Sequence, residues 1–226
     1  MNNDKKLEIL TADNSVLLCI DYQPEMFFGV ASIDRGMLKN NVLGLAKSAK
    51  LFKVPTIITS VESESFSGYV LPELLDVFPT QDIIDRSSMN SWDSADVRKS
   101  IAATNRKKLI LAGLWTEVCI NLCALSALTA GYEIYVVEDA CGGTSEMAHR
   151  VAMNRMIQVG VVPLTWQQLL LEWQRDWAKK DTYDGVMTIV QEHSGAYGMG
   201  VDYASTMIHK QKQRTHATGK ISRNLP

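Results

Sequence analysis

The chain has 226 residues, of which 46% are hydrophobic and 21% charged, and its formal net charge at pH 7 is −2. This length and composition suit one globular domain with a sizeable core, and the charge argues against a nucleic-acid partner, because phosphates need a basic surface. No stretch has the ~18 consecutive apolar residues that cross a bilayer, and the N-terminus lacks the basic start and apolar run of a signal peptide.

Short β-rich apolar runs alternate along the chain with segments of helical spacing. The runs predict strands at residues 16–20, 56–59, 82–85, 108–112, 133–137 and 161–164. Helices are predicted between them, at residues 36–52, 72–78, 94–103, 116–128 and 146–159. Pro163 argues that the last strand lies at a sheet edge or a strand end. Right-handed crossovers then give an α/β fold of three layers, with a six-stranded parallel, Rossmann-like sheet covered by helices on both faces.

After residue 164 the pattern becomes helical but irregular, as far as residue 212. Trp166, Trp173 and Trp177 have helical spacing, which fits packing on their own domain and an oligomer contact equally well. We therefore divide the chain into a main domain at 1–180 and a helical C-terminal extension at 181–226 that packs in an oligomer. The basic run at 209–214 is interpreted as a solvated helix end or tail.

Three polar residues stand where predicted strands end. Asp21 follows the first strand, Arg86 follows the third, and Cys119 lies in the first turn of the helix after the fourth. Ligands of parallel sheets bind beyond the carboxyl ends of the strands, so these side chains should share one rim. A thiol exposed at a helix N-terminus has a lowered pKa, and a carboxylate held by a cation can take its proton. Taken singly, Cys119 also fits a buried core cysteine, Asp21 a turn residue, and Arg86 a surface ion pair.

Two motifs carry a resemblance to a known family. Leu17-Leu18-Cys19-Ile20-Asp21-Tyr22-Gln23 resembles the first-strand motif of the isochorismatase-like cysteine hydrolases. Gly113-Leu114-Trp115-Thr116-Glu117-Val118-Cys119 resembles their second signature, Gly-x-x-Thr-(Asp/Glu)-x-Cys. The resemblance covers roughly residues 12 to 180, and Asn90-Ser91-Trp92-Asp93 and Thr165-Trp166 are similar to the YcaC-like branch.

The resemblance implies a hydrolase of a small amide-like or related substrate. Cys119 would be the nucleophile and Asp21 the general base and acid. Arg86 stands where the family usually has lysine, and unlike lysine it can orient and stabilise charge but does not shuttle protons. A non-proline cis peptide is expected at Leu114–Trp115, turning the Trp115 amide toward the Cys119 amide to form an oxyanion hole. The Trp115 ring would either narrow the pocket or turn into a subunit contact.

Other cofactors and partners are not indicated. The region of Glu62 and Glu64 lacks the Asp-x-His cluster of the metal-binding nicotinamidase relatives, so no metal is expected. Without a Gly-x-Gly-x-x-Gly or Walker loop, no nucleotide cofactor is expected. The four sparse cysteines favour a reducing, cytoplasmic setting. His149 is assigned no role. The resemblance implies a large homo-oligomer, such as an octamer.

Two other functions remain open from the sequence. Cys123 lies one helical turn from Cys119, so the pair could cycle between thiol and disulfide in a redox protein. Arg86 in place of lysine also leaves open a non-catalytic ligand-binding assembly protein, because a family fold does not fix a reaction.

Overall fold

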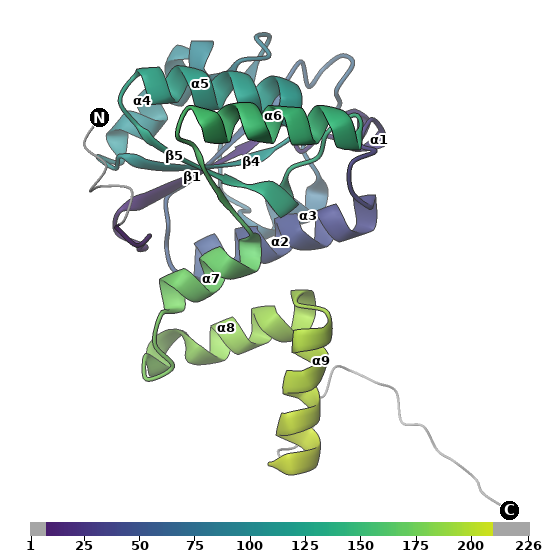
Figure 1. The fold of residues 1–226 in the computed structure, drawn as a ribbon, viewed down its shortest axis with the longest axis vertical. Coiled ribbons are helices and arrows are strands. Elements are labelled where there is room, and N and C mark those ends of the chain that lie inside the picture. Colours follow the sequence, from purple (N-terminus) through teal and green to yellow (C-terminus); the bar gives the residue numbers. More distant parts are fainter. Residues whose placement is uncertain (1–7, 210–226) are drawn as a thin grey trace, which may run out of the picture.

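The structure is a computed structural model that describes residues 8–209. Six parallel strands form one sheet in the order β3-β2-β1-β4-β5-β6 (Figure 1). They span Ser15–Ile20 (β1), Thr56–Val61 (β2), Ile83–Arg86 (β3), Lys108–Gly113 (β4), Glu133–Val137 (β5) and Val162–Leu164 (β6). The predicted fold class is confirmed, and Pro163 does lie in an edge strand, where a missing N–H group breaks no inner ladder.

Helices cover both faces of this sheet. The helices of residues 8–209 are α1 (Pro24–Phe28), α2 (Arg35–Leu51), α3 (Pro72–Val77), α4 (Ala95–Ala103), α5 (Asn121–Thr129), α6 (Glu146–Gln158), α7 (Trp166–Gln174), α8 (Lys180–His193) and α9 (Ala196–Tyr203). Short 3-10 turns occupy Ser91–Asp93 and Glu138–Ala140, and π-helical turns occupy Thr116–Ile120 and Ala204–Ile208. In Figure 1, α4, α5 and α6 lie above the sheet, and α2, α3 and α7 lie below it.

The central strand β1 divides its side chains between two hydrophobic cores. Leu17 and Cys19 join the core under α2 and α7, whereas Val16, Leu18 and Ile20 join the core under α4, α5 and α6. Successive side chains of a strand point to opposite faces, and both faces are covered here. This explains why the strand is apolar at consecutive positions.

Short polar side chains set the starts of several helices. Asp34 accepts a hydrogen bond from the Met37 amide at 2.8 Å, so α2 begins one residue before the predicted start. Ser94 caps α4, and at the start of α6 the Ser145 hydroxyl accepts from the Ala148 amide at 3.0 Å.

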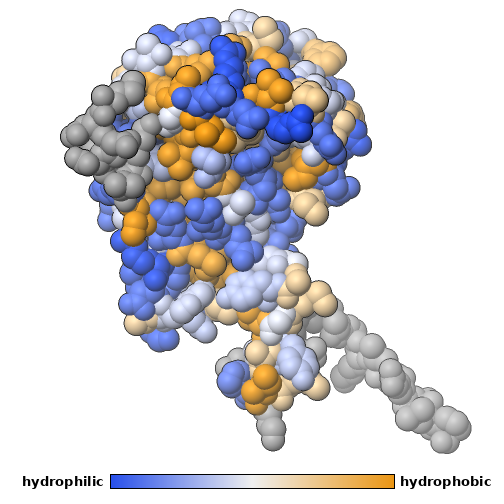
Figure 2. Space-filling view, viewed as in Figure 1, coloured by the Kyte–Doolittle hydropathy of each residue, from blue (hydrophilic) through white to orange (hydrophobic). Residues whose placement is uncertain are grey.

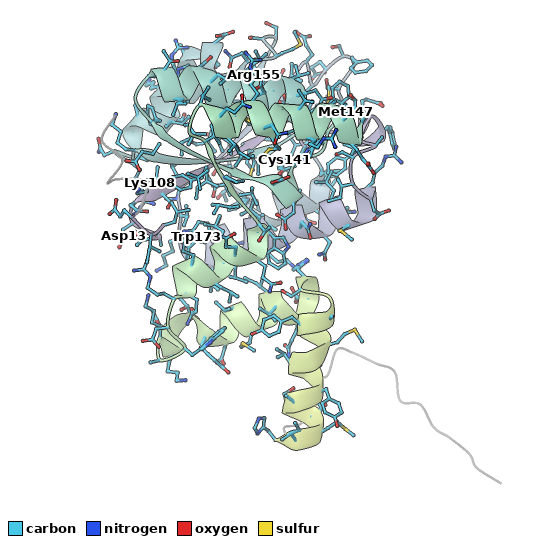
Figure 3. The ribbon with its side chains drawn as sticks, viewed as in Figure 1. Asp13, Lys108, Cys141, Met147, Arg155 and Trp173 are labelled. Atoms are coloured by element: carbon cyan, nitrogen blue, oxygen red, sulfur yellow. The ribbon has the colours of Figure 1, made fainter. Side chains whose placement is uncertain are left out.

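The Trp-rich helix α7 packs on its own domain. Trp166 and Trp173 are each 4% exposed and belong to the core below the sheet, where Figure 3 labels Trp173. The alternative that these two rings make an oligomer contact is therefore wrong, because each is already buried within its own chain. Trp177, beyond the end of α7, is 44% exposed.

Within the predicted C-terminal extension, α8 packs on α2, and α9 packs on α8 and projects away from the sheet (Figure 1). None of the helices in residues 8–209 is long and apolar enough to cross a membrane. Of the basic run at 209–214, all but His209 lies outside the described residues.

Candidate active site

Asp21, Arg86 and Cys119 meet at the carboxyl edge of the sheet. Arg86 is the last residue of β3, and its Nη2 lies 2.7 Å from both carboxylate oxygens of Asp21. The Cys119 thiol is hydrogen-bonded to the same carboxylate. All three residues are buried, with Asp21 completely inaccessible. A buried carboxylate thus contacts both a permanent cation and a thiol.

The turn after β1 holds Asp21 in an uncommon backbone conformation. Its φ is +56°, in the left-handed region that non-glycine residues rarely adopt and that costs on the order of 1 kcal/mol or more. Gln23 supports the turn, since its amide donates to the Val61 carbonyl at 3.0 Å and accepts from the Val61 amide at 2.9 Å. Through these two hydrogen bonds, Gln23 links the ends of β1 and β2.

The segment between β4 and α5 brings Cys119 back to this edge. A side chain at Gly113 would place its Cβ 2.1 Å from the Ile20 carbonyl oxygen, so only glycine fits there. The Leu114–Trp115 peptide bond is cis. The backbone N–H of Trp115 is hydrogen-bonded to the sulfur of Cys119. Cys119 lies in the π-helical turn, two residues before α5 begins at Asn121.

The Trp115 ring packs inside its own chain, over the end of α1. Its Nε1 donates to the Met26 carbonyl at 2.7 Å. A Cβ at Gly29 would come within 2.4 Å of the ring, so the glycine makes room for it. The ring is half-buried between the segment that follows Asp21 and the segment that carries Cys119.

The predicted lowering of the Cys119 pKa is wrong. The thiol is buried rather than exposed at a helix N-terminus, and burial together with the charge of Asp21 raises its pKa well above the usual value. Arg86 and the Trp115 amide oppose this shift without cancelling it. Burial also raises the pKa of Asp21, against the lowering effect of Arg86. The resting site therefore holds a neutral thiol beside a carboxylate of increased basicity.

His149, to which the sequence assigned no role, is hydrogen-bonded to the segment that carries Cys119. Its Nδ1 lies 2.8 Å from the Thr116 hydroxyl, and its Nε2 lies 3.5 Å from a carboxylate oxygen of Glu138. Thr116 also donates its amide to the Gly142 carbonyl at 2.9 Å. These contacts fasten the turn that carries Cys119 to α6 and to the end of β5.

Two further polar residues of this segment were given no role by sequence reasoning. Glu117 and Asn121 are four residues apart and both face α6. Helical spacing places such residues on one face, and polar side chains on the largely apolar α5 segment were the available signal.

The remaining cysteines are packed in the cores. Cys19, Cys119, Cys123 and Cys141 are all free thiols and all buried. Burial raises the pKa of Cys123 to about 11 and that of Cys141 to about 12. The Cys119–Cys123 redox function gains no support, since disulfide exchange needs an accessible thiolate.

Within residues 8–209 no group of three or more His, Cys, Asp and Glu side chains is arranged to hold a metal ion. Glu62 and Glu64 are exposed, and Glu64 accepts a hydrogen bond from the Tyr69 hydroxyl at 3.0 Å.

Comparisons with known proteins place the chain in a family. The isochorismatase domain model matches residues 15–168. The chain is 36% identical over 189 residues to the probable hydrolase YcaC of Escherichia coli, covering 83% of this chain and 90% of that protein.

Two solved structures share the fold. YcaC from Pseudomonas aeruginosa, with hexane-2,5-diol and covalent acrylamide, has a TM-score of 0.85 at 33% identity, covering 88% of this chain and 98% of that one. YcaC from E. coli, an octameric hydrolase of unknown specificity, has a TM-score of 0.83 at 35% identity, covering 87% and 97%. The chain belongs to the YcaC branch of the isochorismatase family of hydrolases.

Proposed function

We propose that the protein is a cysteine-nucleophile hydrolase that acts on a small amide-like or related substrate through a thioester acyl-enzyme. The observation that carries this proposal is the hydrogen bond between the Cys119 thiol and Asp21, whose two oxygens are held by Arg86. A nucleophile, an adjacent base and a group that orients the base are the elements of an activated nucleophile.

In the acylation step, Asp21 accepts the thiol proton as the sulfur of Cys119 attacks the substrate carbonyl. The backbone N–H groups of Trp115 and Cys119 stabilise the negative charge on the carbonyl oxygen. Asp21 then passes its proton to the leaving amine, the carbon–nitrogen bond breaks, and the acyl group remains on sulfur as a thioester.

In the deacylation step, Asp21 takes a proton from water, which attacks the thioester carbonyl. The carbon–sulfur bond breaks, the thiolate recovers the proton, and the free acid leaves. Arg86 stays charged throughout, because guanidinium does not titrate in this range. No step uses a metal.

The direction of both pKa shifts sets the timing of proton transfer. Since burial keeps the Cys119 thiol neutral and makes Asp21 more basic, the thiol ionises during attack rather than beforehand. The proposal therefore predicts slow alkylation of the free enzyme and faster reaction with molecules that bind as substrates do.

The related Pseudomonas structure offers a first probe. It contains covalent acrylamide, a small primary amide with an electrophilic carbon. We extend this chemistry to the present chain and expect acrylamide to modify Cys119.

We further propose that the chain forms a homo-oligomer, as the octameric E. coli relative does, through the projecting extension. Residues 196–208 include a single charged side chain, Asp202, and Figure 2 shows apolar and weakly polar groups over this arm. Met199 and Met207, spaced to share a helix face, are 72% and 66% exposed. Exposed apolar patches mark interaction sites.

Four free cysteines support a reducing, cytoplasmic compartment.

The test is a screen of small amides, esters and carbamates, read by mass spectrometry for product and for acyl-enzyme. Cys119→Ala should lower turnover by at least ~10³-fold and leave no adduct. Cys123→Ala is the matched control, a buried cysteine one turn away, and should keep most of the activity.

Unchanged turnover in Cys119→Ala would sink the hydrolase scheme. Equal loss in both variants, with reversible disulfide formation, would favour the redox function instead. Saturable binding of a screened compound without product, in the wild type, would favour a non-catalytic binding protein.

A further inference from the structure

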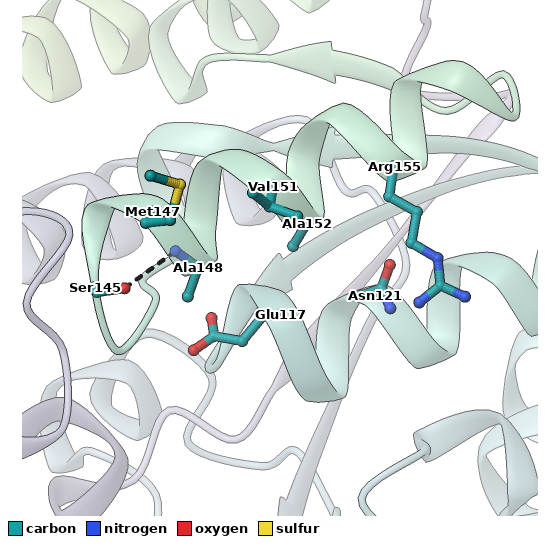
Figure 4. Close-up of a pocket in the computed structure, with 8 residues that line it drawn as sticks. All are labelled: Glu117, Asn121, Ser145, Met147, Ala148, Val151, Ala152 and Arg155. Carbon is teal, nitrogen blue, oxygen red and sulfur yellow. Dashed lines mark hydrogen bonds between the residues drawn. The ribbon is translucent and has the colours of Figure 1, made fainter.

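A groove lies on the outer side of the segment that carries Cys119, between that segment and α6 (Figure 4). It encloses about 400 Å³, a volume within the range of small-molecule sites. The groove is separate from the Asp21–Arg86–Cys119 contact, and the proposal below does not depend on the hydrolase chemistry.

Two buried acceptor atoms without donors belong to side chains that line the floor of the groove. Oε1 of Glu117 accepts from the amide and the hydroxyl of Thr144, at 2.9 and 2.6 Å, but Oε2 has no partner among the residues described. Oδ1 of Asn121 is likewise unpaired, and Asn121 is only 3% exposed. A buried acceptor that has lost water without gaining a donor is unfavourable, so the floor is suited to a ligand that brings N–H groups.

The other surfaces of the groove differ in character. Met147 and Val151 of α6 form an apolar wall and are 59% and 55% exposed. Arg155 lines the end of the groove near Asn121, as Figure 4 shows, and takes part in no ion pair within residues 8–209. An anion at one end, an apolar wall and a cation at the other end define a dipolar site.

We propose that this groove binds a small zwitterion, with a primary ammonium and a carboxylate joined by a short aliphatic chain. The ammonium has three donors, enough for Oε2 of Glu117 and Oδ1 of Asn121. The aliphatic chain covers Met147 and Val151, and the carboxylate pairs with Arg155. Charges that are paired at both ends and partly screened from water favour this ligand over a singly charged one.

The experiment titrates the full-length protein with δ-aminovalerate, pentylamine and valerate by calorimetry. We expect saturable binding of one δ-aminovalerate per chain, weaker binding of pentylamine, and the weakest binding for valerate. Glu117→Gln retains an acceptor for Thr144 but turns an N–H₂ donor toward the ligand, so it should weaken both amines by about tenfold or more.

Arg155→Gln tests the carboxylate end of the site independently of the ammonium end. It should lower δ-aminovalerate affinity to that of pentylamine and leave pentylamine binding unchanged within about twofold. Glu146→Gln is the matched control, because Glu146 is an exposed carboxylate at the start of α6 outside the groove. This control should bind all three probes as the wild type does.

The absence of saturable δ-aminovalerate binding would overturn the proposal, whether the groove is unsuited or covered by another copy. So would tighter binding of valerate than of pentylamine, or equal weakening by Glu146→Gln. Should Glu117→Gln fail to fold, Asn121→Leu, similar in shape but without the acceptor, tests the same floor. Wild-type affinity in that variant would overturn the role of Asn121 and with it the site.

Discussion

The sheet edge and the projecting helix α9 depart from ordinary protein construction in opposite ways. At the sheet edge, a carboxylate, a guanidinium and a thiol are withdrawn from water. On α9 and the turn after it, methionine, tyrosine and isoleucine side chains face water. Soluble proteins usually place these groups the other way round. The buried set finds its partners within one chain, whereas nothing within residues 8–209 covers the exposed set. We infer that the chemistry is completed by one subunit and the packing of α9 by a second.

The largest expected effect concerns the base in the buried set. Asp21→Asn preserves shape but cannot accept the thiol proton, so kcat/KM on any confirmed substrate should fall by about 10²–10⁴-fold. Asp82→Asn is the control, since Asp82 is an exposed carboxylate one residue before β3. Comparable losses in the two variants would show that the loss of activity does not come from removing the carboxylate beside Cys119 in particular.

Arg86 offers a finer test of the same set. Activity requires ionised Asp21, whose pKa is raised, so the rate should fall as pH drops through a value above the usual carboxyl range. Arg86→Gln removes the cation that opposes this shift, and the acid limb of kcat/KM should move to higher pH by about one unit or more. Arg86→Lys keeps a cation and should restore the wild-type limb. If the acid limb of kcat/KM does not move in Arg86→Gln, the group whose ionisation sets that limb is not Asp21.

The exposed set is tested by placing a charge on α9. Met199→Asp should shift the sedimentation coefficient toward smaller species, while kcat per chain stays within about threefold of the wild type. Met37→Asp is matched, because Met37 is also exposed but lies on α2. If activity is lost together with assembly, the site at the sheet edge depends instead on a neighbouring subunit.

The smallest effect belongs to Asp139, a half-buried carboxylate that accepts a hydrogen bond from the Trp166 amide at 2.8 Å. Burial raises its pKa to about 6, so the folded state binds its proton more tightly than the unfolded state. Stability conferred by that proton is lost as pH rises from about 4 to 7. Asp139→Asn should be roughly 1–2 kcal/mol more stable than wild type at pH 7.5, with no difference near pH 4, as measured by urea unfolding.

Sequence periodicity sufficed for the strands and most helices, because buried strands and amphipathic helices leave distinct patterns. It also brought Asp21, Arg86 and Cys119 to one edge, since the ends of parallel strands coincide. The predicted sign of the Cys119 pKa shift was wrong, because that sign depends on how completely the surrounding segments exclude water.

Other contacts between distant segments could not be predicted from the sequence. The bond from His149 to Thr116 joins residues 33 positions apart, and no local pattern indicates it. The burial of Trp166 and Trp173 was undecided for a related reason. Aromatic residues at helical spacing look alike whether the surface they meet belongs to their own chain or to another.

The burial of every cysteine has a consequence for the lifetime of the enzyme. Oxidants and alkylating agents attack thiolates, and the raised pKa values leave few thiolates at neutral pH. A thiol that stays protonated is protected from the peroxides that oxidise preformed thiolates. The protein should therefore keep its activity through storage in air without added reductant, giving up some speed in its first chemical step for durability between turnovers.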